Sequence, residues 1–163
     1  MADKGSGPLL SRAPTESDLV RIARSLNAEG VSYAVIGGFA MIHYGYVRAT
    51  MDIDLLVRPE PENIERIRRA LSILEDKAVL DVRPDDVKQY NVVRVADEVV
   101  IDLLAQACEV TLTDVAAEIE MEVVHGVAIP FLSPKALLMT KQTPRDKDAL
   151  DRLFLQELLA NDP

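Results

Sequence analysis

The sequence contains a single cysteine, Cys108, and only two histidines, His43 and His125. One cysteine cannot form an intrachain disulfide, which is typical of proteins in the reducing cytoplasm, where we expect this chain to act. Two isolated histidines and one cysteine do not make the ligand set of a zinc site. His43 lies in an apolar stretch, so we interpret it as a partly buried helix residue rather than a catalytic base.

The sequence also lacks any run approaching the ~20 consecutive apolar residues of a membrane-spanning helix, so we expect no membrane partner. The N-terminal residues 1–14, MADKGSGPLLSRAP, contain no apolar segment of a signal peptide and predict a flexible tail. Apolar residues nevertheless make up 48% of the 163 residues, which is enough to build a core. We therefore expect a single domain over residues 15–163.

Positive charge is scarce, because 18 Lys and Arg residues stand against 27 Asp and Glu residues, which gives a formal net charge of −9. Non-specific binding to nucleic acid depends on neutralising phosphates with Lys and Arg, so we expect no non-specific DNA binding. This net charge does not exclude a specific nucleic-acid substrate that binds to a local basic patch.

The most informative stretch is residues 32–57, SYAVIGGFAMIHYGYVRATMDIDLLV. Its β-branched and aromatic residues predict one strand over Ser32–Ile36 and a second over Met51–Val57. Between them, a glycine pair precedes a short apolar helix, Phe39–Tyr44, which Gly45 is well placed to end.

Asp52 and Asp54 lie two residues apart on the second predicted strand, so their carboxylates project from the same face. Adjacent carboxylates repel each other unless they share a proton or a cation, and Mg²⁺ prefers oxygen ligands. Gly37 and Gly38 precede the helix, where bare backbone N–H groups favour phosphate binding. Taken singly, the glycines could form a tight turn and the aspartates a solvated edge. Together they indicate a phosphate and metal site.

A third carboxylate, Asp102, interrupts the apolar run VVIDLLA, and a charge in such a run is costly unless it is paired or bound to a metal. We interpret Asp102 as a member of the same cluster as Asp52 and Asp54. The alternative is an aspartate that forms a salt bridge with a nearby arginine, or a surface aspartate at the margin of the sheet.

The rest of the chain predicts an α/β (α+β) domain with a mixed β-sheet flanked by helices. Helices are expected after the capping pair Thr15 and Asp18 and over residues 64–74, and strand hairpins over residues 91–104 and 121–132. Asp81–Gln89 is expected to be a mobile loop near the site, and residues 109–120 a short helical piece. Four arginines after the second strand predict a solvated helix face rather than a nucleic-acid contact: Arg58, Arg66, Arg68 and Arg69.

The C-terminal part predicts a helical pair. Ser133 and Pro134 are suited to begin its first helix, and Pro130 restricts the preceding strand to an edge or to its own end. The second helix is expected to bury four apolar side chains, Leu150, Leu153, Phe154 and Leu158.

The order G-G, short helix, then R-x-T-x-D-x-D resembles the signature of the nucleotidyltransferase fold shared with DNA polymerase β. The closest resemblance is to small bacterial nucleotidyltransferases of the AbiEii type, whose relatives include toxins of toxin–antitoxin systems. It extends from about Thr15 onward, and the C-terminal order S-P-x-x-L, K, R-x-K-D is similar to their C-terminal block.

This resemblance implies transfer of a nucleoside monophosphate from an NTP such as ATP to an acceptor hydroxyl, with release of pyrophosphate. It implies two Mg²⁺ ions, with Mn²⁺ as an alternative ion, held by Asp52, Asp54 and Asp102 as the catalytic carboxylates. The glycine pair, Gly37 and Gly38, would cradle the outgoing phosphates.

Three further residues are candidates for nucleotide binding. Arg48 would contact phosphate or orient Asp52, and Thr50 would cap or orient the loop. Lys141 would contact the triphosphate, and the alternative is an exposed lysine at a helix end.

The acceptor stays open between a tRNA, a protein hydroxyl and a small molecule such as an aminoglycoside. The resemblance also implies a cognate antitoxin or toxin protein as partner. The alternative function is a non-catalytic nucleotide-binding or toxin–antitoxin partner protein that retains the fold, although three intact carboxylates argue against it.

Overall fold

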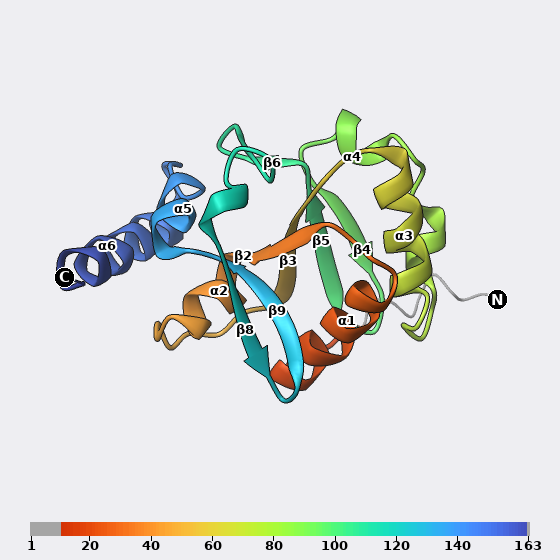
Figure 1. Cartoon of the computed structure of the whole chain (residues 1–163), viewed down its shortest axis with the longest axis horizontal. Helices are drawn as coiled ribbons and strands as arrows, with labels where there is room; N and C mark the ends of the chain where they lie inside the picture. The colour runs from red at the N-terminus through yellow and green to blue at the C-terminus, as the bar shows by residue number, and fades with distance from the viewer. Residues whose placement is uncertain (1–10, 163) are drawn as a thin grey trace.

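The structure is a computed structural model that describes residues 11–162. Within these residues, six strands form one mixed sheet in the order β4-β5-β3-β2-β9-β8 (Figure 1). Their bounds are Tyr33–Ile36 (β2), Asp52–Val57 (β3), Val93–Ala96 (β4), Val100–Leu104 (β5), Ile119–Val124 (β8) and Val127–Leu132 (β9). Two short strands, β6 (Gln106–Ala107) and β7 (Val110–Thr111), form a separate ribbon.

The α-helices are α1 (Glu16–Ala28), α2 (Gly37–His43), α3 (Pro61–Leu71), α4 (Asp86–Gln89), α5 (Pro134–Met139) and α6 (Asp146–Ala160). Two 3₁₀ turns, η1 (Ala78–Asp81) and η2 (Ala116–Glu118), complete the elements of the described chain. The C-terminal pair α5 and α6 lies on the opposite side of the molecule from α3 (Figure 1). Within residues 11–162, none of the helices combines the length and apolar character that crossing a bilayer requires.

The predicted mixed sheet is confirmed. β3 is antiparallel to β2 and parallel to β5. The two hairpins that the sequence predicted are β4–β5 and β8–β9, and both are antiparallel. The helix starts are also as expected, because Thr15 and Asp18 form a reciprocal capping box and the Ser133 hydroxyl accepts a hydrogen bond from the N–H of Ala136.

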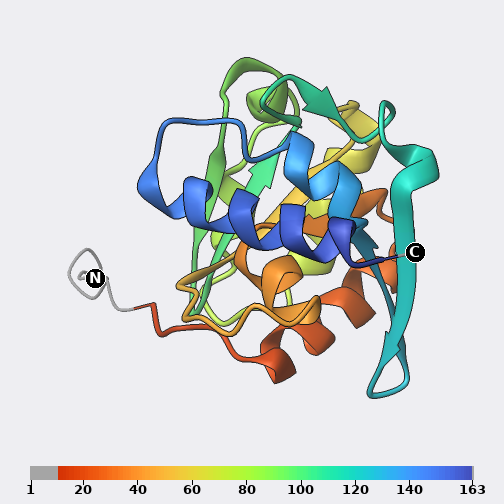
Figure 2. The ribbon, with the colours of Figure 1, turned by 90° about the vertical axis from the view of Figure 1, so that its left-hand side faces the viewer.

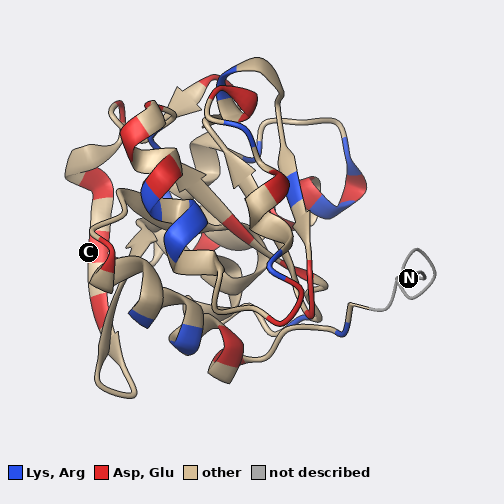
Figure 3. Ribbon diagram, turned by 90° about the vertical axis from the view of Figure 1, so that its right-hand side faces the viewer, with Lys and Arg blue, Asp and Glu red and all other residues tan. Residues whose placement is uncertain are grey.

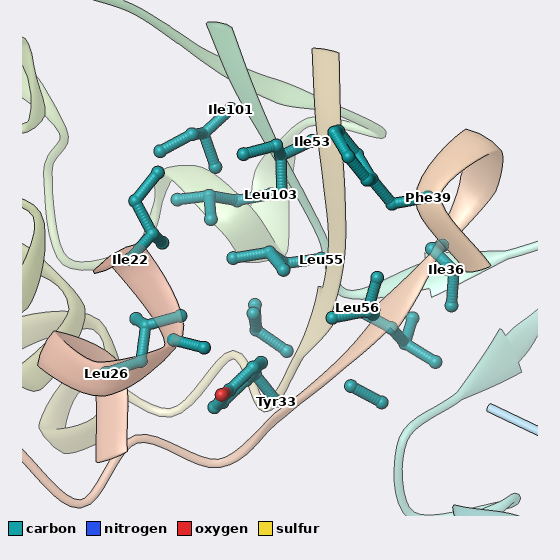
Figure 4. Close-up of a cluster of buried hydrophobic side chains, with 14 of the residues drawn as sticks. Ile22, Leu26, Tyr33, Ile36, Phe39, Ile53, Leu55, Leu56, Ile101 and Leu103 are labelled. Carbon is teal, nitrogen blue, oxygen red and sulfur yellow. The ribbon is translucent and has the colours of Figure 1, made fainter. Parts of the chain in front are cut away.

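Alternation along β3 separates the core from the site. Ile53 and Leu55 are fully buried and point toward β5 and α1, where they meet four apolar side chains, Ile101, Leu103, Ile22 and Leu26 (Figure 4). Because neighbouring residues of a strand face opposite ways, this burial directs Asp52 and Asp54 to the other face of the sheet. The core therefore fixes which way the two carboxylates point.

The face formed by α1 and α3 carries charges of both signs (Figure 3). Arg69 pairs with Glu29 at 3.0 Å, and Arg68 lies 3.7 Å from Glu65 on the same helix. Arginines that are already paired with acids on an exposed face fit the predicted solvated helix surface.

The prediction for α6 was wrong in part. Leu150 and Leu153 are 57% and 56% exposed, and the fully buried stripe of the helix is Asp148, Asp151 and Leu155. These residues are spaced three and four apart, so they share one face of the helix. The aspartates are buried because cations meet them there, as described below for the site.

Pro130 does not mark an edge strand, because β9 pairs with β8 on one side and with β2 on the other. The pairing with β2 is restricted to Val35 and Phe131, so Pro130 lies outside it. Asp81–Gln89 is not an irregular loop throughout, since it contains α4. The helical piece predicted within residues 109–120 is η2.

Residues 1–10 of the predicted flexible tail lie outside the described residues. Ser11 and Arg12, which are described, contact the β4–β5 turn. The Ser11 hydroxyl donates to the carbonyl of Asp97 at 2.6 Å, and the Arg12 N–H donates to the carbonyl of Glu98 at 3.0 Å. The part of the tail nearest α1 therefore packs on the domain.

Candidate active site

Three carboxylates meet on one face of the sheet. Asp52 and Asp54 project from β3, and Asp102 lies directly opposite Asp54 in the parallel register of β3 and β5. One oxygen from each lies within 4.8 Å of the others. Oxygen ligands at this spacing are suited to a hard divalent cation, so the cluster could hold a metal.

The electrostatics of the cluster favour a cation. Burial, followed by the charges of the neighbouring Asp52 and Asp102, raises the pKa of Asp54 to about 7, against an opposing effect of Lys141 and Lys147. Burial and the charge of Asp102 also raise the pKa of Asp52. Carboxylates whose ionised forms are mutually destabilised gain most from a bound divalent cation, which relieves that repulsion.

The glycine pair makes room for site side chains. Gly37 has φ of +69°, and a Cβ there would overlap the carboxylate of Asp54. A Cβ on Gly38 would lie 2.5 Å from the hydroxyl of Thr50 and 3.2 Å from the guanidinium of Arg48. Gly37 lines the cavity described below, whereas Gly38 is buried behind it. Glycine is therefore required at both positions because the neighbouring site side chains pack too closely to leave space for a Cβ.

Thr50 and Arg48 hold the segment between α2 and β3. The Thr50 hydroxyl donates to the carbonyl of Asp52 at 3.0 Å, which fixes the chain at the start of β3. Arg48 donates to the carboxylate of Asp151 on α6 at 3.0 Å, so its partner in the structure is Asp151 rather than Asp52.

Lys141 is buried, which excludes the alternative of an exposed lysine at a helix end. Its Nζ lies 3.0 Å from Asp151 and 3.9 Å from Asp148. Asp148 also accepts hydrogen bonds from Thr143 and Arg145 at 2.5 Å and 2.9 Å. These contacts fix the connection between α5 and α6, and with it the ammonium group of Lys141.

The carboxylates and these cations line one cavity of about 600 Å³. Its basic side chains are Arg48, Lys141, Arg145 and Lys147, together with Arg94 beside the carboxylates. α6 crosses the molecule in front of the sheet, and the connection that carries Thr143 and Arg145 reaches toward β4 and β5 (Figure 2). The cavity thus combines carboxylates on the sheet, which could hold a metal, with cations that come mainly from the C-terminal part of the chain, a pairing suited to a metal-bound polyphosphate.

Sequence reasoning missed five residues of the site, which are Arg94, Arg145, Lys147, Asp148 and Asp151. Arg94 contacts both Asp52 and Asp102, and the aspartates of α6, Asp148 and Asp151, hold the cations. Lys147 lines the same cavity. The available signal was the spacing of Asp148, Asp151 and Leu155, which follows one helical face. His43, as expected, is a half-buried helix residue, and it stacks on Phe131 with ring centroids 4.0 Å apart.

Comparison with solved structures identifies the fold. TM1012 of Thermotoga maritima, provisionally described as a nucleotidyltransferase, has a TM-score of 0.57 and 20% identity, covering 93% of this chain and 94% of that chain. The lincosamide antibiotic adenylyltransferase LnuA, solved with lincomycin bound, has a TM-score of 0.57 and 16% identity, covering 90% of this chain and 99% of that chain. The likeness shows that the chain has the nucleotidyltransferase fold.

Sequence comparison identifies the family. No curated protein matches the chain. The model of the family described as "Nucleotidyl transferase AbiEii toxin, Type IV TA system" matches residues 18–143, which is most of the chain and includes all three carboxylates. The protein is therefore a member of the AbiEii nucleotidyltransferase toxin family.

Proposed function

We propose that this protein is a Mg²⁺-dependent nucleotidyltransferase that moves a nucleoside monophosphate from an NTP to an acceptor hydroxyl. The observation that carries the proposal is the cavity itself, in which three carboxylates within 4.8 Å of one another share the wall with five basic side chains, among them the buried Lys141. A carboxylate cluster alone would repel a triphosphate, so its place in a polyphosphate site requires a divalent cation.

The proposed metal ligands are Asp52, Asp54 and Asp102. We propose that they hold two Mg²⁺ ions, and that Mn²⁺ can replace Mg²⁺. When bound, the ions would neutralise phosphate charge and lower the pKa of the acceptor hydroxyl. The donor set fits them, because all three of its groups are carboxylates, whose oxygens are the ligands that Mg²⁺ and Mn²⁺ prefer.

The reaction forms a bond between the acceptor oxygen and the α-phosphorus and breaks the bond from that phosphorus to the β-phosphate bridging oxygen. Asp102, the member of the cluster on β5, is the proposed recipient of the acceptor proton. The negative charge that develops on the leaving pyrophosphate is proposed to be met by Lys141, which follows α5, and by Lys147 in the first turn of α6. Gly37 at the cavity wall allows the phosphates a close approach.

Arg48 and Thr50 are proposed to act through positioning. Arg48 fixes Asp151, which in turn orients Lys141, and Thr50 holds the backbone of Asp52. Arg48 also lines the cavity, so a direct contact with phosphate is part of the same proposal.

The cellular role that we propose is that of a cytoplasmic toxin with a cognate antitoxin protein, as the family description implies. The acceptor is proposed to be a hydroxyl of an RNA, a protein or a small molecule. A non-catalytic nucleotide-binding role is the second candidate, and the complete set of three carboxylates favours the enzyme over it.

Calorimetry tests the proposal. ATP and GTP are titrated into the protein with Mg²⁺ and, separately, with EDTA. We expect binding of at least one NTP with Mg²⁺ and a large loss of affinity in EDTA, and the same loss in Asp52→Asn with Mg²⁺ present. Asp146→Asn, which changes an exposed carboxylate at the start of α6, is the matched control and should bind as the wild type does. Equal affinity in EDTA and in Mg²⁺ would contradict the metal role.

A further inference from the structure

Arg94 lies in direct contact with the carboxylate cluster. It is opposite Asp102 in the antiparallel register of β4 and β5. Its Nε donates to Oδ1 of Asp102 at 2.9 Å and its Nη2 to Oδ2 of Asp102 at 2.9 Å. The same Nη2 also donates to Oδ2 of Asp52 at 3.2 Å. The guanidinium therefore makes a forked contact with one carboxylate and bridges to a second.

This bridging position is one that a metal ion would need. A cation shared by Asp52 and Asp102 has to lie between their oxygens, and Nη2 of Arg94 lies there, within hydrogen-bond distance of both. Two positive groups that close to each other repel strongly in a partly buried site. Arg94 and a metal bridging these two residues therefore exclude each other.

The Arg94 side chain can also move away from the two carboxylates into water. Its side chain is 58% exposed, whereas that of Asp102 is 8% exposed. An arginine at a cavity rim can return to water at little cost, but a buried carboxylate without a partner is destabilised. Exchange of Arg94 for a metal would keep Asp102 paired throughout.

We propose that Arg94 is an internal counter-ion of the carboxylate cluster, which a divalent cation must displace from Asp52 and Asp102 in order to bind. The proposal rests on the metal site of the proposed function. It implies that Arg94 weakens the binding of free metal and so favours entry of the metal together with a triphosphate, whose oxygens supply further ligands. If Arg94 instead served only to orient Asp102 for the metal, its loss would weaken metal binding.

Titration of Mn²⁺, followed by the electron paramagnetic resonance signal of the free ion, separates the two roles without any activity measurement. We expect Arg94→Gln to bind Mn²⁺ up to about fivefold more tightly than the wild type, the factor that corresponds to loss of a competing, partly exposed ion pair. Arg69→Gln is the matched control, because Arg69 is 52% exposed and pairs with Glu29 far from the cluster. It should leave the affinity unchanged. An affinity of Arg94→Gln equal to or weaker than that of the wild type would overturn the proposal.

A second measurement uses the unchanged protein, in case Arg94→Gln does not fold. The Nε–H resonance of Arg94, assigned by its loss in Arg94→Lys, should shift on saturation with Mg²⁺ as its hydrogen bond to Asp102 is lost. A resonance that stays in place at saturating Mg²⁺, or absence of Mg²⁺ and Mn²⁺ binding, would refute displacement. Displacement of Arg94 in a protein that transfers no nucleotide would instead leave this inference standing and remove the proposed function.

Discussion

Asp54→Asn should stabilise the protein in EDTA, and the gain should grow with pH. The folded protein raises the pKa of Asp54 from 3.8 to about 7, chiefly through burial and then through Asp52 and Asp102. Between these values the folded state holds a proton that the unfolded chain has released, so the free energy of unfolding of the wild type falls as pH rises. Above about pH 7 the full cost of the buried charge is present. Asparagine does not titrate and avoids this cost.

The size of the effect follows from the shift in pKa. Each unit corresponds to about 1.4 kcal/mol, so a shift of roughly three units sets an upper bound of about 4 kcal/mol. We expect a gain of roughly 2–4 kcal/mol at pH 8, which stays at or below that bound because Asp54 is only partly buried and solvent screens part of its charge, and no gain at pH 4. Saturating Mg²⁺ should reverse the order, since only the wild type keeps the complete ligand set.

Urea denaturation of both proteins in EDTA at several pH values measures the difference. Asp146→Asn, which alters an exposed carboxylate, serves as the control and should change the free energy of unfolding by no more than about 1 kcal/mol at any pH. A wild type that is more stable than Asp54→Asn at pH 8 in EDTA would refute the account, because the Asp54 carboxylate would then be stabilised by its surroundings.

Three further changes test other parts of the site. Asp151→Ala should lower the free energy of unfolding by about 3–5 kcal/mol in urea denaturation, because it removes the carboxylate that the buried Lys141 shares with the half-buried Arg48. A loss below about 1 kcal/mol would contradict this. Gly37→Ala should lower the free energy of unfolding by about 2–4 kcal/mol, more than Gly126→Ala does, because both glycines have positive φ but only a Cβ on Gly37 meets a side chain. Equal losses would show that contact with the Asp54 carboxylate does not explain the effect. Asp102→Asn should lower the free energy of unfolding by about 1 kcal/mol at most, since its partner Arg94 can return to water, yet it should lower nucleotide transfer roughly 10²–10⁴-fold. A large fall in melting temperature with normal transfer would show that Asp102 has a structural role alone.

Local patterns predicted the elements around the carboxylates correctly. The alternation of polar and apolar residues over 51–57 fixed the direction of Asp52 and Asp54, because one face of β3 is buried in the core. Both interpretations of Asp102, as a member of the carboxylate cluster and as the partner of an arginine, agree with the structure. Asp102 lies in the carboxylate cluster and also pairs with an arginine, Arg94.

The contacts that depend on register or on distant packing could not be predicted. Arg94 meets Asp102 only because a specific register joins β4 and β5, and predicting a hairpin over residues 91–104 did not by itself determine that register. The buried face of α6 was misassigned because leucines such as Leu150 outnumber the aspartates. Asp151 is buried there by cations from two other parts of the chain, and no periodicity within the helix encodes those partners.

The central claim is that the carboxylate cluster catalyses nucleotide transfer, and its most direct test is a labelling experiment. The protein is incubated with each of the four NTPs, labelled at the α-phosphate, with Mg²⁺ and a cell extract, and the RNA, protein and small-molecule fractions are analysed. The account predicts label in one fraction with the wild type, and none with the double variant Asp52→Asn/Asp54→Asn or in EDTA. Equal labelling by the wild type and a folded double variant, or no labelling by a wild type that binds NTP and Mg²⁺, would contradict it.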